Sequence, residues 1–439
     1  MNQELTNFAA RLRGLILSEG RVPRGPDSAI RNPQSTVENG GSQSSTLRNF
    51  DALALELFAL QLKCNPAYRK ICAGRKLMPG AVEHWTEIPV VPTAVFKELE
   101  LTCIPPAERA AVFHSSGTTE QKPSRHFHCA ESLAVYEASL LSWFLENVLP
   151  DLRFTNYDLR ANQESAIRNP QSVIFLTPPA EQAPHSSLVH MFETIRQELG
   201  GANVAARRAL FGEVAADGSW TLDFAAVIEL LSSVGSCPRS RRGDEASNHS
   251  GKHEDGASSR RLLRNENIGG QALLLGTAFS FVHLLDYLAE KNLRFRLPPG
   301  SRVMETGGYK GRSRTMPKAE LHALITERLG IQPENIICEY GMSELSSQGY
   351  DSAIHPPSAI LHPRVFRFPP WARVQIISPE TGREVAEGET GLIRVFDLAN
   401  VFSVLAIQTE DLGVRRGDGF ELIGRAALAE ARGCSLMTD

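Results

Sequence analysis

A run of serine, threonine and glycine in the first third of the chain has the composition of a phosphate-binding loop. Residues 113–124 read FHSSGTTEQKPS and lie between an apolar segment and a stretch of helical periodicity. Glycine lets the main chain approach an anion, while amide and hydroxyl groups donate hydrogen bonds to phosphate oxygens. Lys122 would add a positive charge, although the spacing is not that of a Walker loop. A serine- and threonine-rich connector without a ligand is the alternative interpretation.

A hydroxyl and a carboxylate follow a second apolar segment, ICEYGMSELSSQ at residues 337–348. Ser343 and Glu344 come directly after an apparent turn at Gly341. A carboxylate at the end of a strand that faces a triphosphate can hold Mg²⁺, which prefers oxygen ligands. Open parallel sheets bind their ligands at the carboxyl ends of the strands. Taken alone, Glu344 is also consistent with a solvated surface acid.

Three further segments contain residues that suit a nucleoside. Asp411, expected at a turn in QTEDLG, can accept hydrogen bonds from two ribose hydroxyls, and Arg425 in LIGR would lie near the same sugar. Gly307 and Gly308 end an apolar stretch, and small residues there let an adenine ring lie against the backbone.

Among the histidines around the serine- and threonine-rich run, His114 is the one expected to touch a ligand. None is expected to be a general base, because a carboxylate substrate is already an anion.

The segments that must position these residues alternate between helical periodicity and short apolar runs. Such alternation predicts a largely parallel sheet with helices on both faces. From residue 373 onward VQII, GLIRVFD and FELIG, with a turn at Gly417–Gly419, predict antiparallel strands. The expected helices are 51–63, 131–149, 281–291 and 318–329, and the expected buried strands are 172–176, 272–275 and 336–338.

The length of the chain allows two or three domain-sized units, and its composition is that of a globular enzyme. Hydrophobic residues make up 42% of the 439 residues, and the net charge of -4 gives no reason to expect nucleic acid or an anionic membrane. No apolar run reaches the roughly 20 residues that span a bilayer. The N-terminus lacks the features of a secretory signal, and the seven cysteines contain no CxxC pair. A cytoplasmic location is expected.

Three stretches, 21–48, 161–172 and 236–270, are expected to be disordered-looking insertions. The first and third are rich in small and polar residues and poor in large apolar ones. The octamer SAIRNPQS occurs at Ser28–Ser35 and again at Ser165–Ser172. It carries a single isoleucine and cannot provide the hydrophobic face of a structural repeat, which favours an inserted genetic repeat.

Taken in order, the Gly-Thr run, the Gly-Gly pair, YGMSE, TED and GR resemble the adenylate-forming superfamily, which includes acyl-CoA synthetases and firefly luciferase. Within it the chain resembles the LuxE-like acyl-protein synthetases, the ligase subunits of a fatty acid reductase. The likeness extends over NPAYRKIC, WTEIPVVPTAVFK, FHSSGTT, METGGYKG, EYGMSELSSQ and ARGCSL.

This resemblance implies an α/β fold like that of the N-terminal domain of adenylate-forming enzymes. It implies doubly wound, largely parallel sheets with a small β-rich subdomain. We expect an α/β adenylation core at 1–370 and the β-rich subdomain with the C-terminal tail at 371–439. The C-terminal lid domain is expected to be absent, because the sequence ends fourteen residues after Arg425. The lysine of that lid would then be replaced by Lys122, Lys310, Arg312 or Arg314, or by a partner protein.

The resemblance also implies a role for individual residues. Ser343 would touch the α-phosphate, Glu344 would hold Mg²⁺, and Asp411 with Arg425 would hold the ribose. Cys434 occupies the place of the cysteine that carries the acyl group in this family, and Arg432 would favour its thiolate. The expected nucleotide-binding residues are Ser115, Ser116, Gly117, Thr118, Thr119, Gly307, Gly308, Tyr340, Gly341, Ser343, Asp411 and Arg425, and the expected catalytic residues are Cys434 and Lys122.

The function implied is that of a long-chain fatty acid–protein ligase that uses ATP and Mg²⁺. It would form an acyl-adenylate, transfer the acyl group to a cysteine, and deliver it to an acyl-CoA or acyl-protein reductase subunit. Two alternatives stay open. One is an acyl- or aryl-CoA ligase of the phenylacetate-CoA ligase type, and the other is a non-catalytic nucleotide-binding subunit of a reductase.

Overall fold

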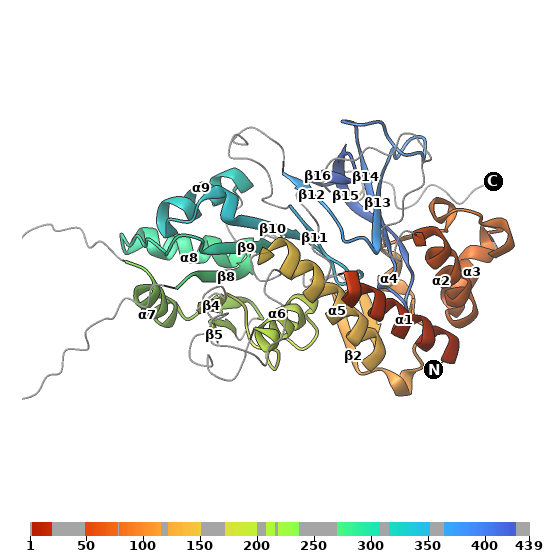
Figure 1. The fold of residues 1–439 in the computed structure, drawn as a ribbon, viewed down its shortest axis with the longest axis horizontal. Helices are drawn as coiled ribbons and strands as arrows, with labels where there is room; N and C mark the ends of the chain where they lie inside the picture. The colour runs from red at the N-terminus through yellow and green to blue at the C-terminus, as the bar shows by residue number, and fades with distance from the viewer. Residues whose placement is uncertain are drawn as a thin grey trace, which may run out of the picture.

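A computed structural model of the chain describes residues 2–19, 49–77, 79–115, 122–150, 172–199, 208–215, 218–236, 270–307, 316–351 and 364–426. Figure 1 shows two main sheets with helices around them. The helices are α1 (Gln3–Glu19), α2 (Phe50–Cys64), α3 (Pro66–Gly74), α4 (Val95–Glu98), α5 (Ala130–Asn147), α6 (Ser187–Glu198), α7 (Phe224–Val234), α8 (Ala278–Glu290) and α9 (Lys318–Leu329). The strands are β1 (Val91–Pro92), β2 (Ala111–His114), β3 (Arg125–His128), β4 (Ser172–Phe175), β5 (Arg208–Leu210), β6 (Gly212–Val214), β7 (Trp220–Leu222), β8 (Ala272–Thr277), β9 (Arg302–Thr306), β10 (Ile336–Tyr340), β11 (Gly349–Tyr350), β12 (Val365–Phe366), β13 (Ala372–Ile377), β14 (Thr390–Asp397), β15 (Ala406–Arg416) and β16 (Gly419–Arg425).

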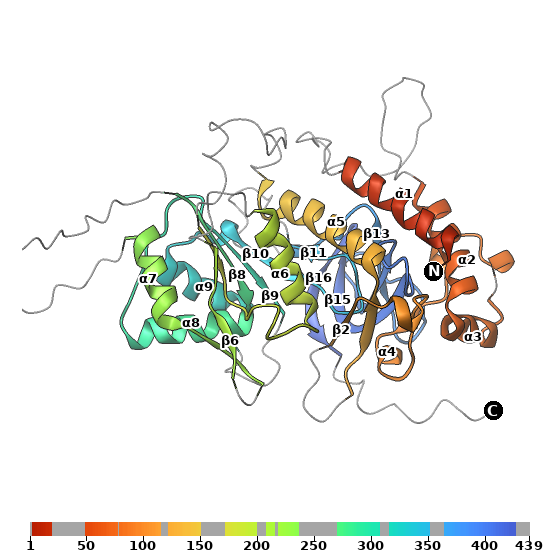
Figure 2. The ribbon, with the colours of Figure 1, turned by 90° about the horizontal axis from the view of Figure 1, so that it is seen from below.

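The first sheet has the strand order β11-β10-β9-β8-β4-β5, and every neighbouring pair is parallel except β10 with β11. Side chains along a strand alternate between its two faces. On β8, Leu273 and Leu275 enter a hydrophobic cluster that includes residues of α5 and α6, while Ala272 and Leu274 enter a cluster with α7, α8 and α9. Helices therefore cover both faces of this sheet, as predicted, and Figure 2 shows α6 and α8 on its two sides.

Local signals in the sequence set the ends of several helices. Asn49, Asp223 and Thr277 accept hydrogen bonds from backbone amides in the first turns of α2, α7 and α8. Gly330 ends α9 with a φ of 71°, a left-handed conformation that favours glycine. The four predicted helices correspond to α2, α5, α8 and α9, and the three predicted buried strands correspond to β4, β8 and β10.

The second sheet is antiparallel along the order β12-β16-β15-β14-β13. The predicted strands VQII, GLIRVFD and FELIG lie in β13, β14 and β16, and Gly417 takes a φ of 59° in the turn before β16. β1 joins this sheet from far upstream and pairs in parallel with β15, with Val91 opposite Ile407. The division of the chain at residue 370 stays a prediction.

Two local predictions are wrong. The Gly-Thr run is not followed directly by a helix, because β2 and β3 form an antiparallel hairpin and α5 begins only at Ala130. Asp411 does not lie at a turn, because residues 406–416 form the single strand β15. In both segments polar residues interrupt the apolar alternation that identifies a strand, and pairing with a neighbouring strand decides the structure instead.

No helix in the described ranges is both long and apolar enough to cross a lipid bilayer. Of the predicted insertions, 21–48 lies outside the described residues. The other two also lie outside them, apart from Ser172, Ser236 and Gly270 at their ends.

Candidate nucleotide-binding site

The β2–β3 hairpin holds the ends of the Gly-Thr run next to the segment that follows β10. Ser115 accepts a hydrogen bond through Oγ from the amide of Ser124 at 2.9 Å. The hydroxyls of Ser124 and Ser343 lie 3.4 Å apart. His126 donates from Nδ1 to the carbonyl of Ser343 at 2.8 Å, since a carbonyl can only accept. Ser115 of the Gly-Thr run and Ser343 were predicted separately to contact phosphate, and Ser124 lies next to both.

His126 is a positioning residue that the sequence did not identify. Its side chain is buried, and the desolvation lowers its pKa to about 4 although the hydrogen bond to Ser343 acts in the opposite direction. The ring is therefore neutral at neutral pH and acts as a fixed donor between β3 and the turn after β10. His114, the histidine expected to touch a ligand, stacks on His185 with ring centroids 4.6 Å apart.

Ser343 and Glu344 form a buried polar turn that is tied to the second sheet. Ser343 Oγ donates to Glu344 Oε2 at 2.9 Å. Asn400 Nδ2 donates to the carbonyl of Glu344 at 3.0 Å, and Asp397 accepts from the amide of Ser346 at 2.9 Å. These two contacts hold the backbone that follows the Glu344 side chain, and His126 holds the Ser343 carbonyl that precedes it. A carboxylate fixed beside a hydroxyl is a donor set that suits a hard cation such as Mg²⁺.

Asp411 and Tyr340 meet where β15 passes the end of β10. Asp411 is paired with Arg425 of β16 in the strand register. Tyr340 donates its hydroxyl to Asp411 Oδ2 at 2.8 Å, while Arg425 Nε lies 3.8 Å from Oδ1. Burial raises the pKa of Asp411, and the hydrogen bond from Tyr340 and the charge of Arg425 oppose that rise. Among the described residues only Arg425 approaches Oδ1, so this oxygen can accept a hydrogen bond from a sugar hydroxyl.

The ends of β9 and β10 lie side by side, and each is followed by glycine. Gly307 has a φ of +72°, and apart from its chain neighbours no atom of the described residues lies within 4 Å of the position that a Cβ would occupy there. At Gly341 a Cβ would lie 2.2 Å from Glu339 Oε1, so only glycine fits without displacing that carboxyl group. The backbone is therefore open at Gly307, while at Gly341 the Glu339 carboxyl group packs against it, and the contact of these glycines with adenine stays a prediction.

Glu339 lies beside Gly341 and, like His126, is a residue that the sequence did not identify. An acid inside the otherwise apolar run IICEY is the signal that could have identified it. Glu339 accepts a hydrogen bond from the hydroxyl of Thr306. Burial raises the pKa of Glu339 to about 7, although this hydrogen bond and the charge of Lys318 lower it. A carboxyl group that titrates near neutral pH therefore lies beside Gly341.

Glutamine in place of Glu339 is expected to change how stability depends on pH. The folded pKa of Glu339 lies above the ordinary value of 4.5, so folding favours the protonated form. The stability it contributes is present below pH 4.5 and is lost as the pH rises towards 7, by about 3 kcal/mol. Glu339→Gln removes this loss, so the variant should gain on the wild type between pH 5 and 7 in urea unfolding. A constant difference across that range would contradict the assignment.

Lys122 lies in the segment that connects β2 to β3, and its side chain contacts Glu98. Its Nζ lies 3.5 Å from Glu98 Oε2, and both side chains are more than half exposed, so this ion pair holds the amine only weakly. The remaining predictions fall on residues outside the described part of the chain, namely Ser116, Gly117, Thr118, Thr119, Gly308, Lys310, Arg312, Arg314, Arg432 and Cys434.

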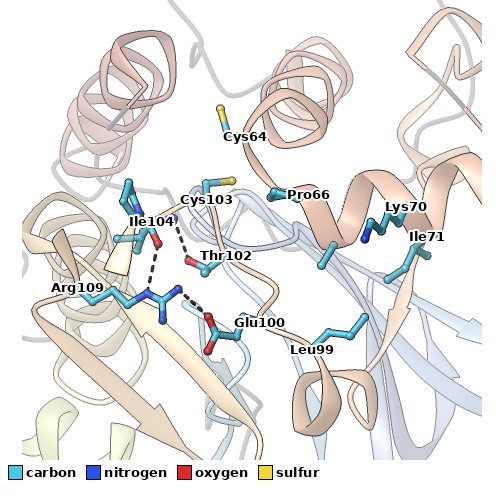
Figure 3. Close-up of a pocket in the computed structure, with 12 residues that line it drawn as sticks. Cys64, Pro66, Lys70, Ile71, Leu99, Glu100, Thr102, Cys103, Ile104 and Arg109 are labelled. Carbon is cyan, nitrogen blue, oxygen red and sulfur yellow. Dashed lines mark hydrogen bonds and ion pairs between the residues drawn. The ribbon is translucent and has the colours of Figure 1, made fainter. Parts of the chain in front are cut away.

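A surface cavity of about 730 Å³ lies elsewhere, between α3 and the segment 99–109. Figure 3 shows Lys70, Cys103 and Arg109 on its wall. None of its described lining residues belongs to the predicted nucleotide-binding set. We therefore place the candidate site at the β2–β3 hairpin and the ends of β9 and β10, where the polar side chains converge, and not at this cavity.

Comparison with known families finds a similarity in the C-terminal part of the chain. Residues 258–439 match the model of the family described as "Acyl-protein synthetase, LuxE". A long-chain-fatty-acid–luciferin-component ligase of Aliivibrio fischeri is 25% identical over 187 residues, which cover 40% of this chain and 47% of the relative. The ligase of the same name from Vibrio harveyi is 21% identical over 184 residues, covering 40% and 46%. The chain thus spans about half the length of these curated relatives. The predicted resemblance to LuxE-like acyl-protein synthetases is confirmed.

Solved structures identify the fold. A 2-hydroxyisobutyryl-CoA ligase in the postadenylation state, in complex with 2-HIB-AMP, superposes with a TM-score of 0.51 and 12% identity, covering 85% of this chain and 67% of that one. The same ligase with R3-HIB-AMP gives a TM-score of 0.52 and 12% identity, covering 91% and 74%. Likeness at this level of identity shows the fold alone. The predicted adenylate-forming fold is confirmed, and the absence of a lid domain stays a prediction.

Proposed function

We propose that the chain is a long-chain fatty acid–protein ligase, which activates a carboxylic acid with ATP and passes the acyl group to a cysteine thiol. The observation that supports this most is the convergence of the hairpin with Ser343 and Glu344. Tyr340, the last residue of β10, contacts Asp411 of β15, which lies beside Arg425 of β16. The fold is shared with a ligase solved in complex with an acyl-adenylate, and the names of the relatives supply the substrate class.

In the first proposed step a carboxylate oxygen of the acid attacks the α-phosphorus of ATP. An oxygen–phosphorus bond forms, the bond to the β-phosphate breaks, and acyl-AMP and pyrophosphate are the products. Ser343 would turn its hydroxyl hydrogen from Glu344 to an oxygen of the α-phosphate, and His126 would keep the Ser343 backbone in place. Asp411 would accept from the ribose, with Tyr340 holding its carboxylate in one orientation.

The residues at the turn after β10 fit Mg²⁺. Glu344 offers an ionisable oxygen donor whose backbone is held by Asn400, and a magnesium ion accepts such donors together with phosphate oxygens. When bound, the ion would neutralise part of the negative charge of the triphosphate.

In the second proposed step the thiolate of Cys434 attacks the carbonyl carbon of the acyl-adenylate. A carbon–sulfur bond forms, the bond to the AMP oxygen breaks, and AMP leaves. The thioester would then be delivered to a reductase subunit, which is the class of partner that consumes an activated acyl group to make an aldehyde. A cytoplasmic location is part of the same proposal.

The test is incubation of the protein with a radiolabelled long-chain fatty acid, ATP and Mg²⁺, with and without coenzyme A. We expect AMP formation that depends on the acid, together with label bound to the protein in the absence of coenzyme A. AMP release only when coenzyme A is present, without labelled protein, would identify a CoA ligase instead. ATP binding in calorimetry without AMP formation would identify a non-catalytic nucleotide-binding subunit.

A further inference from the structure

Six buried or half-buried polar side chains lie between α9 and the first sheet, behind the strand ends of the candidate site. They come from β9, β10, α9 and the segments after β11 and before β12. We call them the Glu305 network, which consists of Glu305, Lys318, His322, Cys338, Asp351 and Arg364.

Glu305 is the centre of this network and is fully buried. Its Oε1 accepts from Lys318 Nζ at 2.6 Å and from Cys338 Sγ at 2.8 Å, with His322 Nε2 at 3.4 Å. Burial raises the pKa of Glu305, but the charge of Lys318 and hydrogen bonds from His322 and Cys338 bring it to about 2. The carboxylate is therefore ionised at neutral pH and is paired with an ammonium group.

The formal charges of the network cancel. Arg364 forms an ion pair with Asp351, just as Lys318 does with Glu305. Arg364 Nη1 also lies 3.3 Å from His322 Nδ1, and because a guanidinium only donates, Nδ1 must accept. The proton of the neutral His322 ring is therefore on Nε2, which donates to Glu305.

This arrangement disfavours a metal ion, although Glu305, His322 and Cys338 place donor atoms within 4.8 Å of one another. The Nε2 of His322 has no free lone pair when Nδ1 accepts from Arg364. A thiol ligand must lose its proton, yet burial raises the pKa of Cys338 well above its usual value. A dication would also add charge to a buried group of residues whose charges already cancel.

The network is connected to the candidate site through two successive pairs in the β9–β10 register. Cys338 lies opposite Glu305, and Glu339 lies opposite Thr306. Each pair is also joined by side chains, the first on the α9 side and the second on the alternate face. Gly307 follows β9 directly, and Tyr340, which contacts Asp411, is the last residue of β10.

The ion pair is a costly way to hold two strands together. Glu305 Oε2 is buried without a hydrogen-bond partner among the described residues, and apolar residues of similar volume often replace a buried ion pair without loss of stability. Orientation is what a charged pair adds, because its geometry is fixed in a way that apolar contacts are not. Because the ion pair lies two residues before Gly307 on β9, the segments that it orients are the ends of β9 and β10.

We propose that Glu305, held by Lys318, is a positioning residue for the nucleotide: it fixes the ends of β9 and β10 so that Gly307 and Tyr340 present one surface to the base and sugar. This proposal rests on the proposed use of ATP. It predicts that removal of the pair weakens nucleotide binding even where the protein stays folded.

The test uses the double variant Glu305→Leu/Lys318→Met, because a single substitution would leave one charge buried and unpaired. The matched control is Glu327→Leu/Arg294→Met, which removes an exposed ion pair of 2.7 Å at the same helix. We expect the double variant to keep the thermal midpoint of the wild type within a few degrees. Its KM for ATP in the AMP-formation assay should rise about tenfold or more, with a smaller change in kcat. The control should change neither.

Hydrogen exchange of peptides covering 302–307 and 336–341 gives a second measurement that does not need enzymatic activity. We expect faster exchange there in the double variant, with no change in β13 and β14. If the wild type forms no AMP, the proposed function fails, and the exchange data still decide whether Glu305 fixes the strand ends. Unchanged exchange and unchanged KM in a folded double variant would overturn the proposal. So would one zinc ion per chain by elemental analysis that is lost in Cys338→Ser.

Discussion

The Glu344→Gln variant is expected to lose acyl-adenylate formation by on the order of a hundredfold in kcat/KM. Glutamine has the same shape and can still accept a hydrogen bond from Ser343. It cannot supply the negative oxygen that we propose for Mg²⁺, and loss of about 3 kcal/mol of charge stabilisation corresponds to such a factor. Release of pyrophosphate with saturating fatty acid measures the effect.

Asp418→Asn is the matched control, because it also neutralises one acid but lies on the exposed turn of the second sheet, next to Arg367. It should keep wild-type activity. Higher Mg²⁺ concentrations should recover part of the activity of Glu344→Gln, since a weakened metal site fills at higher concentration. A Glu344→Gln variant with full activity at low Mg²⁺ would show that the cation is held elsewhere.

The Cys434→Ser variant is expected to lose the acyl-thioester completely while still forming acyl-AMP. A serine hydroxyl is not ionised at neutral pH and is a much weaker nucleophile than a thiolate, so the second step stops. Protein-bound radiolabel that is released by neutral hydroxylamine measures the thioester, and AMP formation measures the first step.

Cys64→Ser is the control, since Cys64 is partly exposed and its pKa is lowered to about 6, with a hydrogen bond from Cys103 as the largest cause. A thiol with a lowered pKa ionises more readily, so Cys64 is the strongest competitor of Cys434 as the acyl acceptor among the described cysteines. It should keep the label. Label that persists in Cys434→Ser and disappears in Cys64→Ser would move the acceptor to Cys64.

Much of the first sheet could be predicted because its strands and helices carry their own signals. The apolar runs at 172–176 and 272–275 have buried faces on both sides, and α9 begins and ends at the predicted residues 318 and 329. Buried strands between amphipathic helices are recognisable without knowledge of their partners. The sequence signal for the turn at Gly417, which connects two antiparallel strands, was also local.

Segments that depend on distant partners could not be predicted. β3 reads RHFH. Its two histidines are buried because Ser343 and nearby aromatic residues surround this strand. β15 contains the polar run QTED, which belongs to a strand because β14 and β16 pair with it on both sides. The separate predictions of Ser343 and Asp411 were possible from motif chemistry, but the roles of His126, Glu339 and Asn400 depend on contacts between segments far apart in the sequence.

β1 has a consequence for experiments on fragments. It contributes only Val91 and Pro92 to the second sheet, yet it covers β15 at Ile407 and Gln408, and Thr93 adds a backbone hydrogen bond to Gln408 at 3.0 Å. A fragment cut at residue 258, where the family match starts, would leave that edge of β15 without its partner. An uncovered strand edge is a template for pairing with another copy, so such a fragment should aggregate. Light scattering during refolding of the fragment measures that aggregation.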